Sequence, residues 1–228
     1  MKKIRILPIM VALLISLSFV TQFNASTRDI TADEILTEKP VSISEVSQKE
    51  GAELLEELTA APKARLLDFK TAEMENCKIV GKSMRYTLSP GEENPVPAFW
   101  EQCFTDGTIA SLELHPHRIH DDVLVGWYGD YNPQDNQVTC IVGIITKFDA
   151  DIPEGMTAME IPTSRFAVGT IFGDEPDIYM MAHQLTYAKL VGEKLEYDMS
   201  RGYEIEWYDN RFCQDDEYRL IDLYIPIK

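Results

Sequence analysis

The chain has 228 residues, with 21 basic and 38 acidic side chains and a formal net charge of −17 at pH 7. This length is sufficient for one sizeable hydrophobic core and does not require a second domain. A surface with this excess of negative charge repels nucleic-acid phosphates and anionic lipid headgroups, which argues against DNA-binding and membrane-surface functions.

Residues 1–25 have the features of a secretory signal peptide. Three basic residues in the first five positions precede an apolar run at positions 6–20, and Ala25 offers a small residue for cleavage. The run is short for a helix that crosses a bilayer, although an uncleaved membrane anchor is the alternative interpretation. We expect a secreted or periplasmic protein with no membrane attachment after cleavage. Cleavage would remove three basic residues and no acidic ones, and would change the net charge from −17 to −20.

Residues 26–69 are predicted to form an acidic leader with a short helix. Ser42 and Glu45 have the spacing of a capping box, and Leu54 and Leu58 mark a short apolar stripe at helical spacing. The leader lacks the basic face that a helix-turn-helix reader of DNA requires.

The next part of the chain is predicted to form a β-α-β-β unit. Apolar residues recur at helical spacing along one stretch, and Trp100 on that face would either pack in the core or line a ligand pocket. Runs rich in branched and aromatic residues predict the strands. The expected elements are a strand at 78–88, a helix at 96–104, and a hairpin of strands at 123–131 and 138–148.

Three of the four histidines lie close together in sequence, at His115, His117 and His120. Imidazole is a suitable ligand for zinc or copper, so a metal site is one interpretation. The spacing matches no standard metal motif, and Pro116 interrupts the cluster. We therefore predict a loop without a metal.

The same β-α-β-β order recurs towards the C-terminus. A short strand at 159–161 leads into a strand at 165–172, a helix that begins near Pro176 and ends near Gly192, and strands at 204–212 and 219–227. Equal element orders in two halves predict an α+β fold of duplicated β-α-β-β units, with an antiparallel sheet, two helices and a central ligand pocket between the halves.

The first of these last two strands separates acidic from apolar side chains. Alternation places Glu204, Glu206 and Tyr208 on one face and Ile205 and Trp207 on the other. The apolar face would enter the core. The acidic face is then either solvated or lines a cavity.

Residues 70–228 resemble the GyrI-like effector-binding superfamily, whose small-molecule-binding domains accompany many bacterial transcription regulators, including those of the AraC type. The resemblance depends on seven segments in the same order. They are Val96–Trp100, Val125–Tyr131, Ile141–Gly143, Ile161–Val168, Gly173–Pro176, Glu206–Phe212 and Leu223–Lys228.

The resemblance implies a tandem repeat of SHS2-like units around a pocket that is lined by aromatic side chains and carries a glutamate for cationic or amphipathic ligands. The matching glutamate here is Glu206, with Tyr208 beside it on the same face. Glu204, Tyr128 and Trp100 complete the candidate ligand-binding set. An acidic leader stands where the regulators carry a DNA-binding domain, which argues against a transcriptional role.

The resulting hypothesis is an exported, stand-alone protein that sequesters or senses an amphipathic or cationic small molecule, with no cofactor and no nucleic-acid partner. One alternative is a hydrolase of strained electrophilic compounds, in which Glu206 with Tyr208 or Tyr128 activates water. A haem-binding relative of the same fold is another, although His183 has no second axial ligand that the sequence identifies.

Four cysteines in an exported protein allow disulfides, but their spacing is wide and irregular. Cys103 and Cys140 both lie in apolar patterns and are predicted to be buried thiols. We expect at most one bridge.

Overall fold

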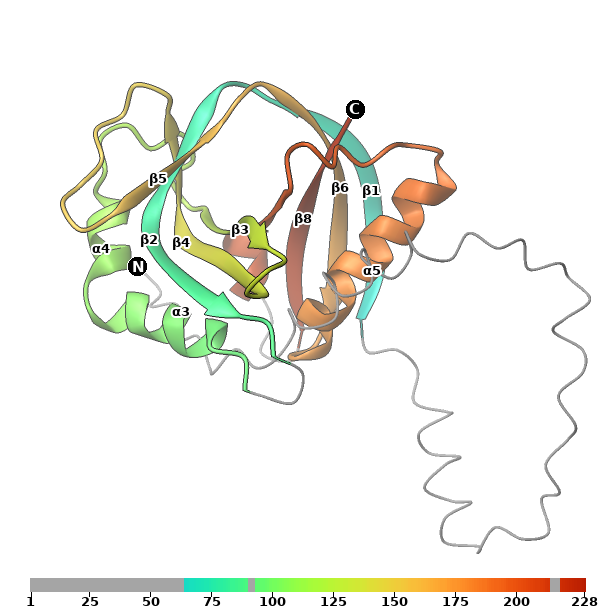
Figure 1. The fold of residues 1–228 in the computed structure, drawn as a ribbon, viewed down its shortest axis with the longest axis horizontal. Helices are drawn as coiled ribbons and strands as arrows, with labels where there is room; N and C mark the ends of the chain where they lie inside the picture. The colour runs from blue at the N-terminus through green and yellow to red at the C-terminus, as the bar shows by residue number, and fades with distance from the viewer. Residues whose placement is uncertain (1–63, 90–92, 214–217) are drawn as a thin grey trace, which may run out of the picture.

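The computed structural model describes residues 64–89, 93–213 and 218–228 (Figure 1). The expected signal peptide and the expected helix of the leader lie outside these residues. The elements are β1 (Ala64–Met74), β2 (Cys77–Thr87), α3 (Val96–Thr105), α4 (Thr108–Glu113), β3 (Leu124–Asn132), β4 (Gln137–Lys147), β5 (Thr157–Ile161), β6 (Ser164–Gly173), α5 (Asp177–Gly192), β7 (Tyr203–Tyr208), η3 (Asn210–Cys213) and β8 (Arg219–Ile227).

The strands form one eight-stranded antiparallel sheet in the order β1-β6-β8-β7-β3-β4-β2-β5. Each half of the sheet has the same internal order: the first strand of the repeat pairs with the last, and the last pairs with the second. The second strands of the two repeats, β3 and β7, pair at the centre of the sheet. The predicted α+β fold of duplicated β-α-β-β units is therefore confirmed.

Two long stretches of chain pass from one half of the sheet to the other. β1 pairs with β6 in one half, and β2, which follows β1, pairs with β5 in the other half. The pair Met74 and Ser164 has the same register as the pair Cys77 and Ile161, so the two chains run side by side from one half to the other, with residues 75–76 and 162–163 between the two ladders. Figure 1 shows these chains arching between the halves of the strongly curved sheet.

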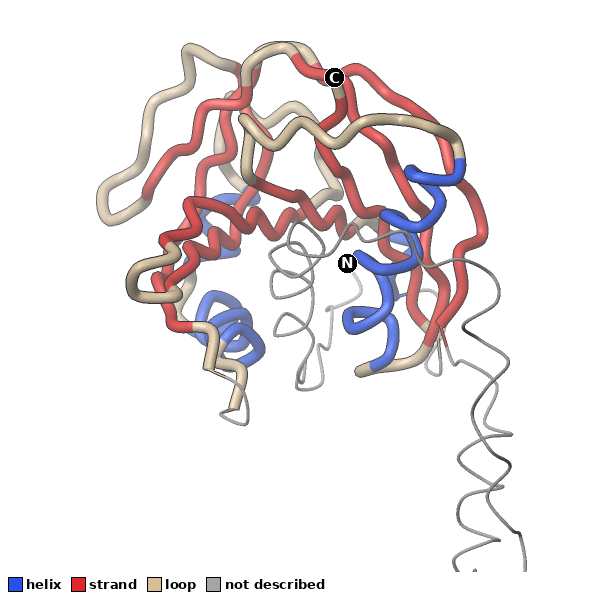
Figure 2. Tube along the Cα trace, turned by 45° about the vertical axis from the view of Figure 1, so that its right-hand side comes forward, coloured by secondary structure: helices blue, strands red, loops and turns tan. Residues whose placement is uncertain are grey.

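The curved sheet has two buried faces. One face packs against the helices, with α3 and α4 over the first half and α5 over the second (Figure 2). The other face contains a separate cluster to which no helix contributes, built from residues such as Ile79, Val125, Phe166 and Ile205. Strands with both faces buried read as continuous apolar runs, which is the pattern of β4 and β6.

β2 and β4 approach each other closely at a pair of glycines. Gly81 and Gly143 are direct cross-strand partners. A Cβ on Gly143 would lie 2.4 Å from the Val80 carbonyl oxygen, and one on Gly81 would lie 2.1 Å from the Val142 carbonyl oxygen. Both neighbours are backbone atoms, so only glycine fits at these positions.

The structure corrects three expectations. β1 begins at Ala64 and crosses the expected boundary between a leader ending at residue 69 and a domain starting at residue 70. Its pattern is weak in the sequence because it is an edge strand, and Ala64 is its single fully buried residue. α4 occupies part of an expected loop, where Ile109 and Leu112 bury one face of a six-residue helix. β7 ends at Tyr208, and η3 follows where the strand was expected to continue.

The cysteine prediction is confirmed for the two residues it concerned. Cys103 and Cys140 are fully buried free thiols, and Cys77 is also free and buried. Within the described parts of the chain, no helix is both long and apolar enough to cross a membrane.

Candidate functional site

β7 lies at the centre of the sheet and presents Glu206 and Tyr208 to the helix-covered face. Tyr208 belongs to the cluster beneath the helices, whereas Tyr203 and Ile205 belong to the cluster on the opposite face and Trp207 packs against it. The predicted alternation is confirmed. Glu206 is 5% exposed, so the acidic face of this strand is not a solvated one.

The Glu206 carboxylate is held by phenols. The Tyr208 hydroxyl donates a hydrogen bond to Glu206 Oε2 at 2.5 Å. Burial raises the pKa of Glu206 to about 7, against the opposing effect of hydrogen bonds from Tyr208 and Tyr128. Among the described residues, no lysine, arginine or histidine forms an ion pair with this carboxylate. Glu206 is therefore a buried acid for which the described part of the chain supplies no counter-ion.

Tyr128 reaches the same carboxylate across a glycine. Gly126 on β3 is the direct cross-strand partner of Glu206, and Tyr128 is two residues along on the same face. A Cβ on Gly126 would lie 3.0 Å from the Tyr128 hydroxyl and 3.2 Å from Glu206 Oε2. The missing side chain thus provides the space in which the carboxylate and the second phenol meet. Burial, reinforced by the Glu206 charge, raises the pKa of both Tyr128 and Tyr208, so both phenols remain protonated donors.

Two further aromatic rings pack against Tyr208, the phenol that bonds to the carboxylate. Trp100 from α3 meets Tyr208 edge-on, with ring centroids 5.1 Å apart. Phe212 from η3 meets the other side of Tyr208 at the same centroid distance. Trp100 is 2% exposed, so it packs within the core while also contacting a site residue.

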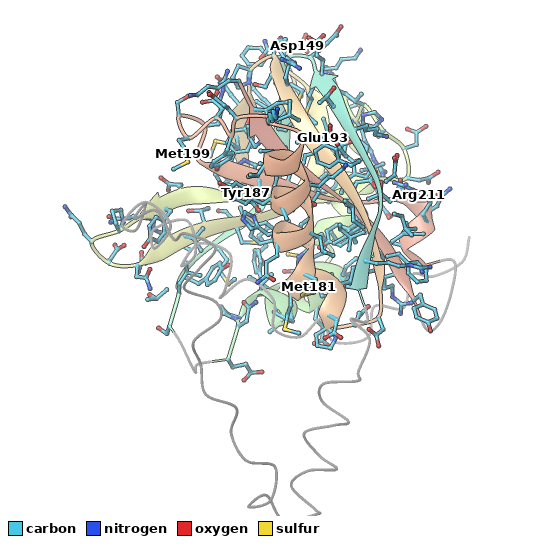
Figure 3. All side chains as sticks on the ribbon, turned by 90° about the vertical axis from the view of Figure 1, so that its right-hand side faces the viewer. Asp149, Met181, Tyr187, Glu193, Met199 and Arg211 are labelled. Atoms are coloured by element: carbon cyan, nitrogen blue, oxygen red, sulfur yellow. The ribbon has the colours of Figure 1, made fainter. Side chains whose placement is uncertain are left out.

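A buried ionic network positions η3. Asp222 on β8 is 4% exposed, accepts a hydrogen bond from Thr170 at 2.6 Å, and pairs with Arg211 at 2.7 Å. Arg211 also forms a two-pronged contact with Asp209. These bonds fasten the segment that follows β7 to β8 and β6, and so fix Phe212 against Tyr208. Figure 3 labels Arg211 at this end of the sheet.

Glu204 lies on the same face but in a different setting. Its carboxylate lies 2.6 Å from His183 Nδ1 on α5. Burial lowers the pKa of His183 and the Glu204 carboxylate raises it, with a net increase. The His183 ring stacks on Tyr187, which Figure 3 labels on α5. Glu204 is thus half of an ion pair, whereas Glu206 is not, and His183 is already engaged with a carboxylate.

Sequence reasoning did not identify three residues at this site. Gly126 was missed because its importance lies in an absent side chain. Cys140 is the direct partner of Tyr128 on β4, and its role was recognised only as that of a buried thiol. Tyr86 on β2 belongs to the same cluster, and its position two residues after the apolar Met84, on the same face of the strand, was the available signal.

The histidine cluster forms no second site. His115 and His117 pack edge-on, and the His120 ring packs against Trp207 on the opposite face of the sheet. Among the described residues, no group of three or more histidine, cysteine, aspartate or glutamate side chains is arranged to hold a metal ion.

Comparisons with known proteins bear on the family and the fold of the chain. The transcriptional regulator BrlR of Pseudomonas aeruginosa is 36% identical over 77 residues, a match that covers 33% of this chain and 28% of that protein. The chain therefore matches under a third of the length of this curated relative.

Two solved structures share the fold. One is a protein bound to tetraphenylphosphonium, with a TM-score of 0.57 and 16% identity over 71% of this chain and 94% of the other. The second is a bacterial transcription regulation protein from Staphylococcus aureus, with a TM-score of 0.52 and 14% identity over 71% of this chain and 98% of the other. Residues 72–227 match the family described as integron-associated effector binding protein. The chain therefore belongs to this effector-binding family, within the GyrI-like superfamily that the sequence resembles.

Proposed function

We propose that this protein is an exported effector-binding protein that captures an amphipathic cation, with Glu206 as the counter-ion for the positive charge. The observation that carries the proposal is the burial of a carboxylate with no basic partner among the described residues. Such a group loses solvation on folding and recovers an electrostatic partner when a cation binds.

The surrounding aromatic groups favour the same class of ligand. Tyr208 and Tyr128 lie beside the carboxylate and Trp100 packs against Tyr208, and each ring face attracts a cation by roughly 0.5–2 kcal/mol. Aromatic surfaces also accept flat apolar groups of many shapes. The solved neighbour with bound tetraphenylphosphonium supports the proposal by analogy, because that ligand is a permanent cation with four phenyl rings.

Calorimetric titration with two probes of matched shape tests the proposal. Tetraphenylphosphonium and tetraphenylborate have similar size and opposite charge. At pH 8, where Glu206 is ionised, we expect the protein to bind the phosphonium and to reject the borate. Glu206→Gln should weaken phosphonium binding by about 1.5–3 kcal/mol, the contribution of a charge-assisted contact.

The control is Glu160→Gln, which removes an exposed carboxylate on β5 and should leave both affinities unchanged. Equal binding of the phosphonium by Glu206→Gln and the parent protein would contradict the proposal. Preference for the borate would contradict it as well.

A second candidate function has one observation in its favour. A carboxylate with a pKa of about 7 is well suited to act as a general base near neutral pH. In that case Glu206 would activate water for attack on a strained electrophile such as an epoxide. Mass spectrometry of the epoxide after incubation would show a diol with the parent protein and none with Glu206→Gln.

A further inference from the structure

Among the described residues, two phenols in the cluster on the site face, Tyr86 and Tyr179, have buried hydroxyls without a hydrogen-bond partner. Tyr179 interacts with the Glu175 carboxylate, which leaves Tyr86 as the phenol to be explained. Tyr86 is 7% exposed, and its hydroxyl oxygen is buried without a partner among the described residues. The Tyr208 hydroxyl bonds to Glu206, and the Tyr131 hydroxyl bonds to Asn136 at 2.9 Å. An unsatisfied buried hydroxyl destabilises a fold, so its presence calls for an explanation.

Tyr86 lies on the face of the sheet that carries the site. It belongs to the cluster that contains Tyr128, Tyr208 and Cys140. Along β4, its partner Val138 is two residues from Cys140, and Cys140 in turn pairs with Tyr128. The Tyr86 side chain therefore projects from the row of side chains next to the one that holds Tyr128.

The hydroxyl can act there only as a neutral hydrogen-bonding group. Burial raises the pKa of Tyr86, and the Cys140 thiol and the Glu206 carboxylate raise it further, so the proton stays on the oxygen at any working pH. The Trp127 Nε1 is also buried without a partner among the described residues, but Trp127 belongs to the cluster on the opposite face of the sheet and so cannot contact a compound bound at Glu206. Tyr86 thus offers a donor, on the site face, that no described residue uses.

We propose that Tyr86 donates a hydrogen bond to an acceptor atom on the bound compound, so that the site selects amphipathic cations that also carry a carbonyl or similar oxygen. This inference rests on the proposed function, since it adds a second recognition element to the cation site. Glu206 supplies the negative charge that pairs with the cation, and the Tyr86 hydroxyl donates a hydrogen bond to an acceptor oxygen elsewhere on the compound.

The test uses three phosphonium probes. Tetraphenylphosphonium establishes cation binding by itself. In the two others, one phenyl ring carries a 4-acetyl group or a 4-isopropenyl group, which have the same shape and differ in the acceptor oxygen. The parent protein should bind the acetyl probe on the order of tenfold more tightly than the isopropenyl probe, the size of one hydrogen bond made in a dry site.

Tyr86→Phe should abolish this tenfold preference and leave the affinity for tetraphenylphosphonium within twofold. Its unfolding temperature should equal or exceed that of the parent protein, because the variant removes an unsatisfied hydroxyl. Tyr131→Phe is the matched control. It removes a hydroxyl that has a partner, so it should lower the unfolding temperature and keep the preference for the acetyl probe.

Two outcomes would overturn the inference while the proposed function stands: equal affinity of the parent protein for the two substituted probes, or an unchanged preference in Tyr86→Phe. The first needs no variant, so it applies even if Tyr86→Phe does not fold. If tetraphenylphosphonium itself does not bind, the proposed function is contradicted and this inference falls with it.

Discussion

Glu206 combines three properties that rarely occur together in one carboxylate. It is buried, it lies at the centre of the sheet, and it accepts a hydrogen bond from Tyr208 without pairing with a described basic residue. Phenols stabilise a carboxylate without neutralising it, so the negative charge stays available once the proton leaves. The result is a site whose charge state changes close to neutral pH.

Glu206→Gln should stabilise the protein by an amount that depends on pH. The folded-state pKa of about 7 lies above the ordinary value of 4.5, so the folded protein holds this proton more tightly than the unfolded chain. The contribution of Glu206 to stability is fully present below pH 4.5 and is lost as the pH rises through 7. The free energy of unfolding of the variant minus that of the parent protein should therefore grow between pH 4.5 and pH 8, by up to about 3 kcal/mol.

Thermal unfolding of both proteins between pH 4.5 and 8.5 measures this difference, which corresponds to roughly 5–10 °C for a domain of this size. The comparison with the parent protein cancels the titration of all other groups. Glu160→Gln should show no such trend, since that side chain is exposed. A difference between Glu206→Gln and the parent protein that stays constant across the range would show that Glu206 titrates normally.

At the scale of elements, the site exists because β3 and β7 pair at the junction of the two halves. Each half contributes one aromatic ring that packs against Tyr208: Trp100 from α3 and Phe212 from η3. In the first half of the sheet, β2 and β4 are in close backbone contact at Gly81 and Gly143.

Gly143→Ala should therefore destabilise the fold by more than about 2 kcal/mol, because the new methyl group would meet the Val80 carbonyl and the backbone cannot easily yield. Urea unfolding measures the change. Gly192→Ala, at the last residue of α5, is the control, since a Cβ there meets nothing within 4 Å. Helix propensity predicts a gain of up to about 1 kcal/mol for that control. Similar effects of the two substitutions would show that the close contact is not needed.

For the whole molecule, the proposed export rests on the basic start and the apolar run within residues 1–25, and the strong negative charge attracts cations to the surface. If the proposal holds, the protein meets compounds before they enter the cell, unlike a regulator that responds to them inside.

Export predicts a definite N-terminus. Protein recovered from cells that express the full chain should begin near Ser26 when its intact mass is measured, and it should be found in the periplasmic or secreted fraction. Most molecules retaining Met1 in the cytosolic fraction would refute the prediction. The Glu206 and Tyr86 experiments do not depend on this outcome.

Local pattern was sufficient for most of the secondary structure. The helical spacing of Val96, Phe99, Trp100 and Cys103 predicted α3, and the expected strand at 219–227 coincides with β8. β1 was missed because it is an edge strand with a single fully buried residue, so its sequence shows little alternation of apolar and polar residues. α4 was missed because six residues carry too few apolar positions to be distinguished from a loop.

Residue spacing along the chain was enough to predict the repeat of β-α-β-β order and the alternation that places Glu206 beside Tyr208, and the family resemblance predicted Glu206 as the charged residue of the candidate site. These features depend on residue spacing along one element. Only the tertiary structure decided that Glu206 lacks a counter-ion among the described residues while Glu204 pairs with His183, and that Gly126 makes room for Tyr128. Burial and charge pairing depend on neighbours from other strands and helices. The spacing of residues along one strand does not indicate which neighbours these are.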